Sequence, residues 1–156
     1  MNNPETNRQL QKLNDLIRKT EELRELSVEI QTHWAKYLCV YTAGFIENAV
    51  KEIFTDFVKR ASSTPVENYA SSVLQKIQNP KMNLIIQTAR AFKKSWGYNV
   101  ENFAKEDNRG DAVDSIMQNR HLIAHGKYSG ITVARVSQYL EKALEVLEYI
   151  ETQCKN

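Results

Sequence analysis

The sequence contains few of the residues that interrupt helices or cross-link small domains. Its 156 residues include five glycines, three prolines and two cysteines. Eight glycines and prolines are too few to separate a set of short strands. Two cysteines exclude a disulfide-rich scaffold and a four-cysteine zinc site, and they suit a reducing compartment.

Long apolar runs and a strong net charge are missing as well. No stretch approaches the roughly 18 uncharged apolar residues of a membrane-spanning helix, and the polar start "MNNPETNRQL" has no apolar signal segment. The formal net charge of +2 means that a local patch has to hold any anionic partner. Hydrophobic residues at 42% and charged residues at 26% are typical of a soluble globule. We therefore expect a soluble cytoplasmic protein without a membrane partner.

Apolar residues recur at helical spacing along almost the whole chain. A chain of this length fits one domain, so we expect residues 1–156 to form a single helical domain. The expected fold is all-α, a single-domain bundle of about six helices with two long N-terminal helices and a long C-terminal helix. The expected helices cover residues 5–30, 32–61, 64 to about 77, 79–97, 111–125 and 132 to about 150, with a loop at 98–110.

Particular residues set these expected boundaries. The first helix carries one apolar stripe, whereas residues 32–61 are apolar on more than one face and should be the central element. "TPVE" at 64–67 has the form of a capping box, "NPK" at 79–81 opens the next helix, and Gly126 follows the fifth. The stripe of the first helix consists of Leu10, Leu13, Leu16, Ile17, Leu23, Leu26 and Ile30.

The stretch "QNRHLIAHGK" at 118–127 places an arginine inside the apolar arc of the fifth helix. Arg120 has to find a carboxylate, backbone carbonyls or a wet cavity there, because an unpaired buried charge is costly. His121 and His125 occupy the neighbouring polar face one turn apart. The arc consists of Val113, Ile116, Met117, Ile123 and Ala124.

Each of these residues also has a purely structural interpretation. Arg120 could extend past the core edge to pair with a glutamate, and His125 could simply cap the helix end. His121 and His125 have the spacing of a zinc pair, but Leu122 replaces the glutamate of H-E-x-x-H and His33 is the only other histidine. We therefore expect no metal site.

This stretch resembles the Arg-x4-6-His motif of the HEPN superfamily. Four residues separate Arg120 from His125, and a polar residue follows the arginine. The RiboL-PSP-HEPN branch looks closest. The glutamate-bearing segment "GFIENAVKE" at 44–52, the motif late in the next-to-last helix and one closing amphipathic helix extend the resemblance over most of the chain.

The resemblance implies a metal-independent endoribonuclease without a cofactor, often a toxin or host-defence effector. It implies a homodimer in which the two motif helices face each other, and in some relatives an antitoxin partner. In the family motif Arg120 and His125 are the catalytic residues, and His121 is the polar position after the arginine. Lys127 and Asn119 are candidates for supporting or RNA-binding roles.

The chemistry of RNA cleavage agrees with this implication. The ribose 2′-hydroxyl attacks its own phosphodiester, which needs a group that moves the proton and a cation for the growing charge; His125 and Arg120 supply them. Residues five apart lie about 140° apart around a helix and about 7.5 Å along it, so one helix presents this pair poorly to one phosphate. We therefore expect His125 of one subunit to act with Arg120 of the other.

Glu47 is the carboxylate that we expect beside Arg120, either within the same subunit or across the dimer. It lies on the crowded second helix, where pairing with the guanidinium would orient it. The alternative is that Glu47 faces solvent through a gap in the apolar coverage.

Two further features differ from the family pattern or lie outside it. A related branch has Arg-x4-His-x-Tyr, but Tyr128 comes one residue late, so we do not expect an antitoxin to modify it. Arg90, Lys93 and Lys94 form a basic ridge that is more typical of a solvated face than of an RNA path.

Two other classes of function remain open. The domain could be a catalytically silent HEPN module that binds RNA, nucleotide or a partner protein. It could also be a dimerisation unit held by its long first and last helices.

Overall fold

The described part of the chain is helical. The computed structural model describes residue 1, residues 3–22, residue 25 and residues 27–155. These residues form α-helices and one short 3-10 helix, with no strand among them, which confirms the expected all-α fold. The elements are α1 (Pro4–Glu22), α2 (Val28–Ala61), α3 (Thr64–Leu74), α4 (Met82–Phe92), α5 (Lys94–Lys105), η1 (Glu106–Asn108), α6 (Arg109–Ala124) and α7 (Val133–Gln153).

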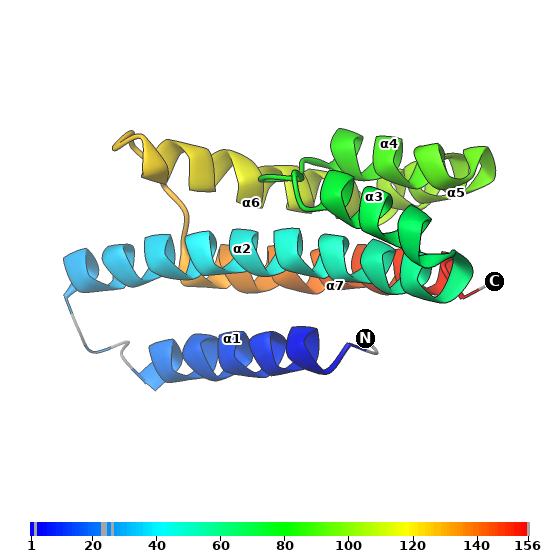
Figure 1. The fold of residues 1–156 in the computed structure, drawn as a ribbon. Helices are drawn as coiled ribbons and strands as arrows, with labels where there is room; N and C mark the ends of the chain where they lie inside the picture. Colours follow the sequence, from blue (N-terminus) through cyan, green and yellow to red (C-terminus); the bar gives the residue numbers. More distant parts are fainter. Residues whose placement is uncertain (2, 23–24, 26, 156) are drawn as a thin grey trace.

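The two longest helices, α2 and α7, run side by side through the middle of the molecule (Figure 1). The helix α1 lies along one side of this pair, and α6 lies along the other side together with α3, α4 and α5. The directions of α1 and α6 are opposite to that of α2 (Figure 1). The C-terminal end of α6 therefore lies beside the N-terminal half of α2.

The central position of α2 follows from its apolar residues on several faces. Leu38, Ile46, Val50 and Phe54 are fully buried, and α7 presents a complementary stripe that includes Val136, Leu147 and Ile150. Phe54 stacks on Phe92 of α4 with ring centroids 5.2 Å apart. Among the described helices, none is long and apolar enough to span a membrane.

The expected boundary between the first two helices is wrong. The helix α1 ends at Glu22 and α2 already begins at Val28, where Ser27 caps it by accepting a hydrogen bond from the Ile30 backbone N–H at 3.4 Å. Ile30 therefore belongs to α2 rather than to the first stripe. Leu23 and Leu26, which we expected to extend that stripe, lie outside the described residues.

The expected single helix at 79–97 is two helices, and the expected loop at 98–110 is mostly helical. Lys93 adopts an extended conformation between α4 and α5, and α5 then continues to Lys105. Gly97 does not end a helix. It lies in α5 where α4 approaches closely, since a Cβ at this position would stand 2.4 Å from the Cβ of Arg90.

The starts of α3 and α4 also differ from the expected caps. Ser63, not Thr64, is the N-cap residue of α3, and no side-chain hydrogen bond closes the capping box. The helix α4 begins at Met82, and Asn79 instead takes a positive φ of 44° and turns its backbone N–H toward Glu47. The segment 79–82 thereby connects α2 to the helical layer above it.

Candidate functional site

The C-terminal end of α6 is closed by a glycine turn. Gly126 has a φ of +64°, a left-handed conformation that glycine adopts without a steric penalty. The Gly126 N–H donates to the Ile123 carbonyl at 3.1 Å, and the Lys127 N–H donates to the Leu122 carbonyl at 2.8 Å. These are the two hydrogen bonds of a Schellman cap. They fix His125 as the C-cap residue of α6.

Asn119 anchors the loop that follows. Its amide donates to the Ser115 carbonyl at 2.9 Å and accepts a hydrogen bond from the Ser129 hydroxyl at 2.7 Å. Ser129 is buried, while the neighbouring Tyr128 is 89% exposed. The amide of Asn119 is therefore engaged in holding the α6–α7 connection next to the motif.

His121 and His125 lie together on the outer face of this helix end. Their ring centroids are 4.4 Å apart, with the planes inclined by 54°. Desolvation of the ring lowers the pKa of His121, and the positive charges of His125, Lys127, Arg120 and Lys81 lower it further. Among the described residues, the charged groups that lower this pKa are thus all cationic, and they favour the neutral form of the imidazole.

Arg120 has no counter-ion within the described chain. Its side chain is half-buried on the core-facing side of α6, yet it makes no hydrogen bond or ion pair with any described residue. An arginine in this position has donors available for an anion or for a second protein chain.

The expected pairing of Arg120 with Glu47 is not formed within the chain. Glu47 instead accepts hydrogen bonds from the Lys51 ammonium at 2.8 Å and from the Asn79 N–H at 2.6 Å. The thiol of Cys39 donates to the Ile116 carbonyl at 3.7 Å, so Cys39 of α2 lies beside Ile116 of the antiparallel α6. Glu47 lies eight residues beyond Cys39, about 12 Å further from the motif end.

Lys81 is a member of the site that the sequence analysis did not identify. Its ammonium donates to the Gln118 side-chain oxygen at 3.2 Å, on the same face of α6 as His121. Nothing local in the sequence indicates this, because Lys81 precedes α4 and reaches α6 only through the fold. Lys127, which we did expect, is exposed directly after the helix end.

The basic ridge of Arg90, Lys93 and Lys94 does not join the site. Arg90 pairs with Glu101 at 2.9 Å, and the α4–α5 junction lies at the opposite end of the molecule from the motif (Figure 1). Among the described residues, no group of three or more histidine, cysteine, aspartate or glutamate side chains is placed to hold a metal ion.

Comparison with known proteins identifies the family. Neither the curated proteins nor the solved structures gave a match. A family model described as RiboL-PSP-HEPN matches residues 5–156, which is nearly the whole chain and includes the whole of α6 and the glycine turn. The chain belongs to the RiboL-PSP-HEPN family.

Proposed function

We propose that the protein is a metal-independent endoribonuclease that cleaves single-stranded RNA as a homodimer. The observation that carries the proposal is Arg120, which has no partner among the described residues, at a helix end that also presents the imidazoles of His121 and His125 and the ammonium groups of Lys127 and Lys81. Such a group of cations suits a phosphodiester, because each phosphate needs positive charge and hydrogen-bond donors.

The proposed reaction uses the 2′-hydroxyl of the RNA as the nucleophile. Its oxygen forms a bond to the neighbouring phosphorus while the bond to the 5′-oxygen breaks, which leaves a 2′,3′-cyclic phosphate. His125 moves the proton that this exchange requires, and Arg120 stabilises the charge that develops on the phosphoryl oxygens. When His125 carries the proton, a neutral His121 avoids a second positive charge on a ring whose centroid is 4.4 Å away.

The geometry of α6 favours a site shared between two copies. Arg120 lies on the core-facing side and His125 ends the helix on its outer face, with about 140° between them. One copy therefore cannot easily bring both groups to one phosphate. In the proposed dimer, Arg120 of one subunit and His125 of its partner act on the same phosphodiester.

Cleavage of matched oligonucleotides tests the chemistry. We expect a single-stranded RNA to be cut equally well with and without excess EDTA, and a DNA of the same sequence to remain intact because it lacks the 2′-hydroxyl. Mass spectrometry should find a cyclic phosphate on the upstream product. Cleavage of the DNA, or cleavage that stops in EDTA, contradicts the mechanism, and RNA binding without cleavage indicates a silent binding module instead.

We further expect the activity to serve as a toxin or host-defence effector, with an antitoxin as a possible partner. Growth arrest on expression of the wild-type chain, and normal growth on expression of His125→Ala, is the result that supports this role.

A further inference from the structure

The N-terminal half of α2 presents a largely apolar stripe to solvent. This α2 stripe consists of Ile30, His33, Trp34, Tyr37 and Val40. Ile30, Tyr37 and Val40 are 41%, 48% and 40% exposed, and the first four residues line a shallow hollow of about 350 Å³. Soluble monomers rarely expose contiguous apolar surface of this kind without a binding role.

The α2 stripe and the two histidines of α6 lie on the same face of the molecule. The segment 79–82 marks this face, because it donates hydrogen bonds to side chains of both helices. On α2 its contact is Glu47, and Val40, Tyr37 and His33 lie two, three and four turns before it on the same side. On α6 its contacts are Asp114 and Gln118, and His121 and His125 continue that side.

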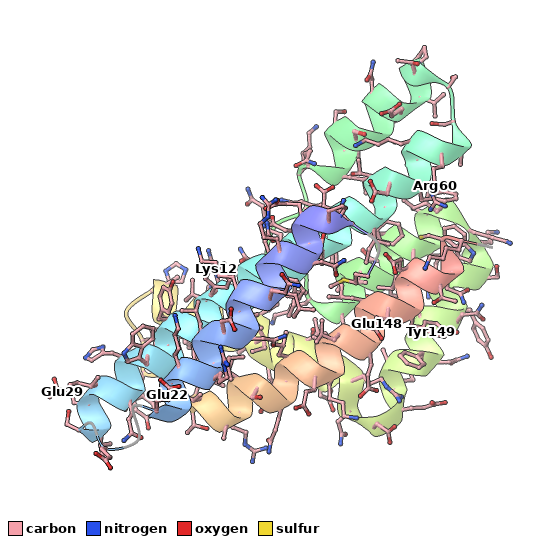
Figure 2. All side chains as sticks on the ribbon, turned by 90° about the horizontal axis from the view of Figure 1, so that it is seen from below. Lys12, Glu22, Glu29, Arg60, Glu148 and Tyr149 are labelled. Atoms are coloured by element: carbon pink, nitrogen blue, oxygen red, sulfur yellow. The ribbon has the colours of Figure 1, made fainter. Side chains whose placement is uncertain are left out.

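No described helix covers this face beyond the segment 79–82. Figure 1 shows α1 below the N-terminal half of α2, α6 above it and α7 behind it, with no helix in front. In Figure 2, seen from below, the same edge of α2 is open beside α1. Lys12, labelled there, belongs to α1 and lies 5.9 Å from the centre of the Tyr41 ring at the margin of the stripe.

We propose that a second copy of this chain covers the α2 stripe, in an interface that continues onto the end of α6. The proposal rests on the proposed function in one respect: a site composed of Arg120 and His125 from different subunits requires such a partner. The surface that joins the two copies is therefore mainly α2, with α6 at its edge.

The area that a stable dimer requires explains why the interface extends to α6. A stable interface buries about 800 Å² per partner and involves roughly 20 to 30 residues on each side. The α2 stripe is smaller than this, so a neighbouring element must contribute. The end of α6 fits, because Arg120 lacks a partner among the described residues and His121 and His125 lie on the same face.

The composition of the stripe favours a second copy over RNA. It carries no lysine or arginine to neutralise phosphates, and Ile30 and Val40 offer no ring on which a base could stack. A stripe without lysine, arginine, aspartate or glutamate is also compatible with itself across a two-fold axis, where a stripe of like charges would repel its copy. Tyr37 lies near the middle of the stripe and therefore close to the expected axis.

Charge placed on the stripe tests the inference. In Tyr37→Glu with Val40→Glu, carboxylates of both copies would meet in an apolar interface, so we expect the dimer dissociation constant to rise at least ~100-fold. The matched control is Val66→Glu with Tyr69→Glu on α3, which changes the same residue types at the same spacing on another exposed apolar surface. Light scattering at micromolar concentration should find a dimer for the wild type and the control, and a monomer for the stripe variant.

A second pair of variants does not depend on disrupting the interface. A short bismaleimide should cross-link Tyr37→Cys into covalent dimers but should not cross-link Tyr69→Cys, which lies outside the stripe. The native Cys39 and Cys154 are buried, so they should not contribute to the reaction. A monomeric wild type overturns the inference, as does a stripe variant that stays dimeric or a Tyr37→Cys chain that is not cross-linked. A monomer whose stripe variant loses RNA binding would assign the stripe to RNA.

These measurements separate the interface from the chemistry. Neither light scattering nor cross-linking involves RNA. A dimer that depends on the α2 stripe but leaves RNA intact would therefore retain the inference and refute the proposed ribonuclease.

Discussion

The imidazole rings of His121 and His125 lie with their centroids 4.4 Å apart at the end of α6. At this separation a positive charge on one ring opposes a positive charge on the other. His125 is indeed among the cations that lower the pKa of His121, after desolvation of the His121 ring itself. The pair is therefore suited to carrying one proton rather than two, which gives the two histidines different roles.

We expect His125→Ala to lower the rate of RNA cleavage by roughly 10² to 10⁴, because the group that moves the proton is lost. His121→Ala should lower it less, since His121 acts beside that group. Single-turnover cleavage of a labelled RNA measures both. If both variants cut at the wild-type rate, the helix end has no part in the reaction.

The lowered pKa of His121 should appear in the dependence of stability on pH. Since its folded-state pKa lies below the unfolded value of about 6.5, the unfolded chain takes up the proton first as the pH falls. Stability contributed by neutral His121 is thus present above pH ~6.5 and is lost as the pH falls through the folded-state pKa. Thermal unfolding at about pH 7 and about pH 5 should show a smaller decrease in melting temperature, from the higher to the lower pH, for His121→Gln than for the wild type. A decrease for His121→Gln as large as that of the wild type would contradict the assignment to the cationic environment of His121.

Arg120 should matter for catalysis and little for folding. Arg120→Met keeps the apolar part of the side chain but removes the guanidinium, so cleavage should decrease by about 10² to 10³. Because Arg120 has no hydrogen bond or ion pair within the described chain, the free energy of unfolding should change by no more than about 0.5 kcal/mol. Urea unfolding of the dimer measures the second value, and a large destabilisation would show that Arg120 has a structural partner.

Gly126→Ala tests the turn that positions His125. A Cβ at Gly126 would meet no atom within 4 Å, so the effect comes from the backbone, whose φ is +64°. A left-handed alanine costs about 1–2 kcal/mol, which chemical denaturation should detect, whereas Gly126→Asn should cost less because asparagine tolerates this conformation. Equal stabilities of the two variants would contradict this account.

The sequence predicts the elements that local signals define. The apolar residues of α7 recur at helical spacing, and Thr132 caps this helix by accepting a hydrogen bond from the Arg135 N–H, so its start was predictable. Gly126 likewise marks the end of α6 through its positive φ. Arg120 and His125 were recognisable because their spacing in a late helix resembles a family motif.

The features that were not predicted depend on contacts between distant segments. Gly97 looks like a helix end in the sequence, but it accommodates Arg90 of the neighbouring helix. Lys93 separates α4 from α5 although it is neither glycine nor proline. Glu47 was expected at Arg120, and the register of α2 on α6 places it next to Lys51 and Asn79 instead. Whether Glu47, Lys127, His121 and Asn119 support RNA cleavage stays a prediction.

Mixed dimers provide a direct test of the shared site. Within one α6 helix, Arg120 and His125 point in directions about 140° apart, so each phosphodiester should be cut by groups of two subunits. A hybrid of His125→Ala with Arg120→Ala then contains one intact combination of Arg120 and His125 across the axis and one that lacks both. Mixing the two inactive proteins should restore up to about half of the wild-type rate per hybrid, because one of two sites is complete.

Differently tagged subunits allow the hybrid to be purified before its rate is measured. Each single variant mixed with itself is the control and should remain inactive. A purified hybrid that cuts no faster than its parents would show that Arg120 and His125 of the same subunit act together, and the composite site would then be wrong.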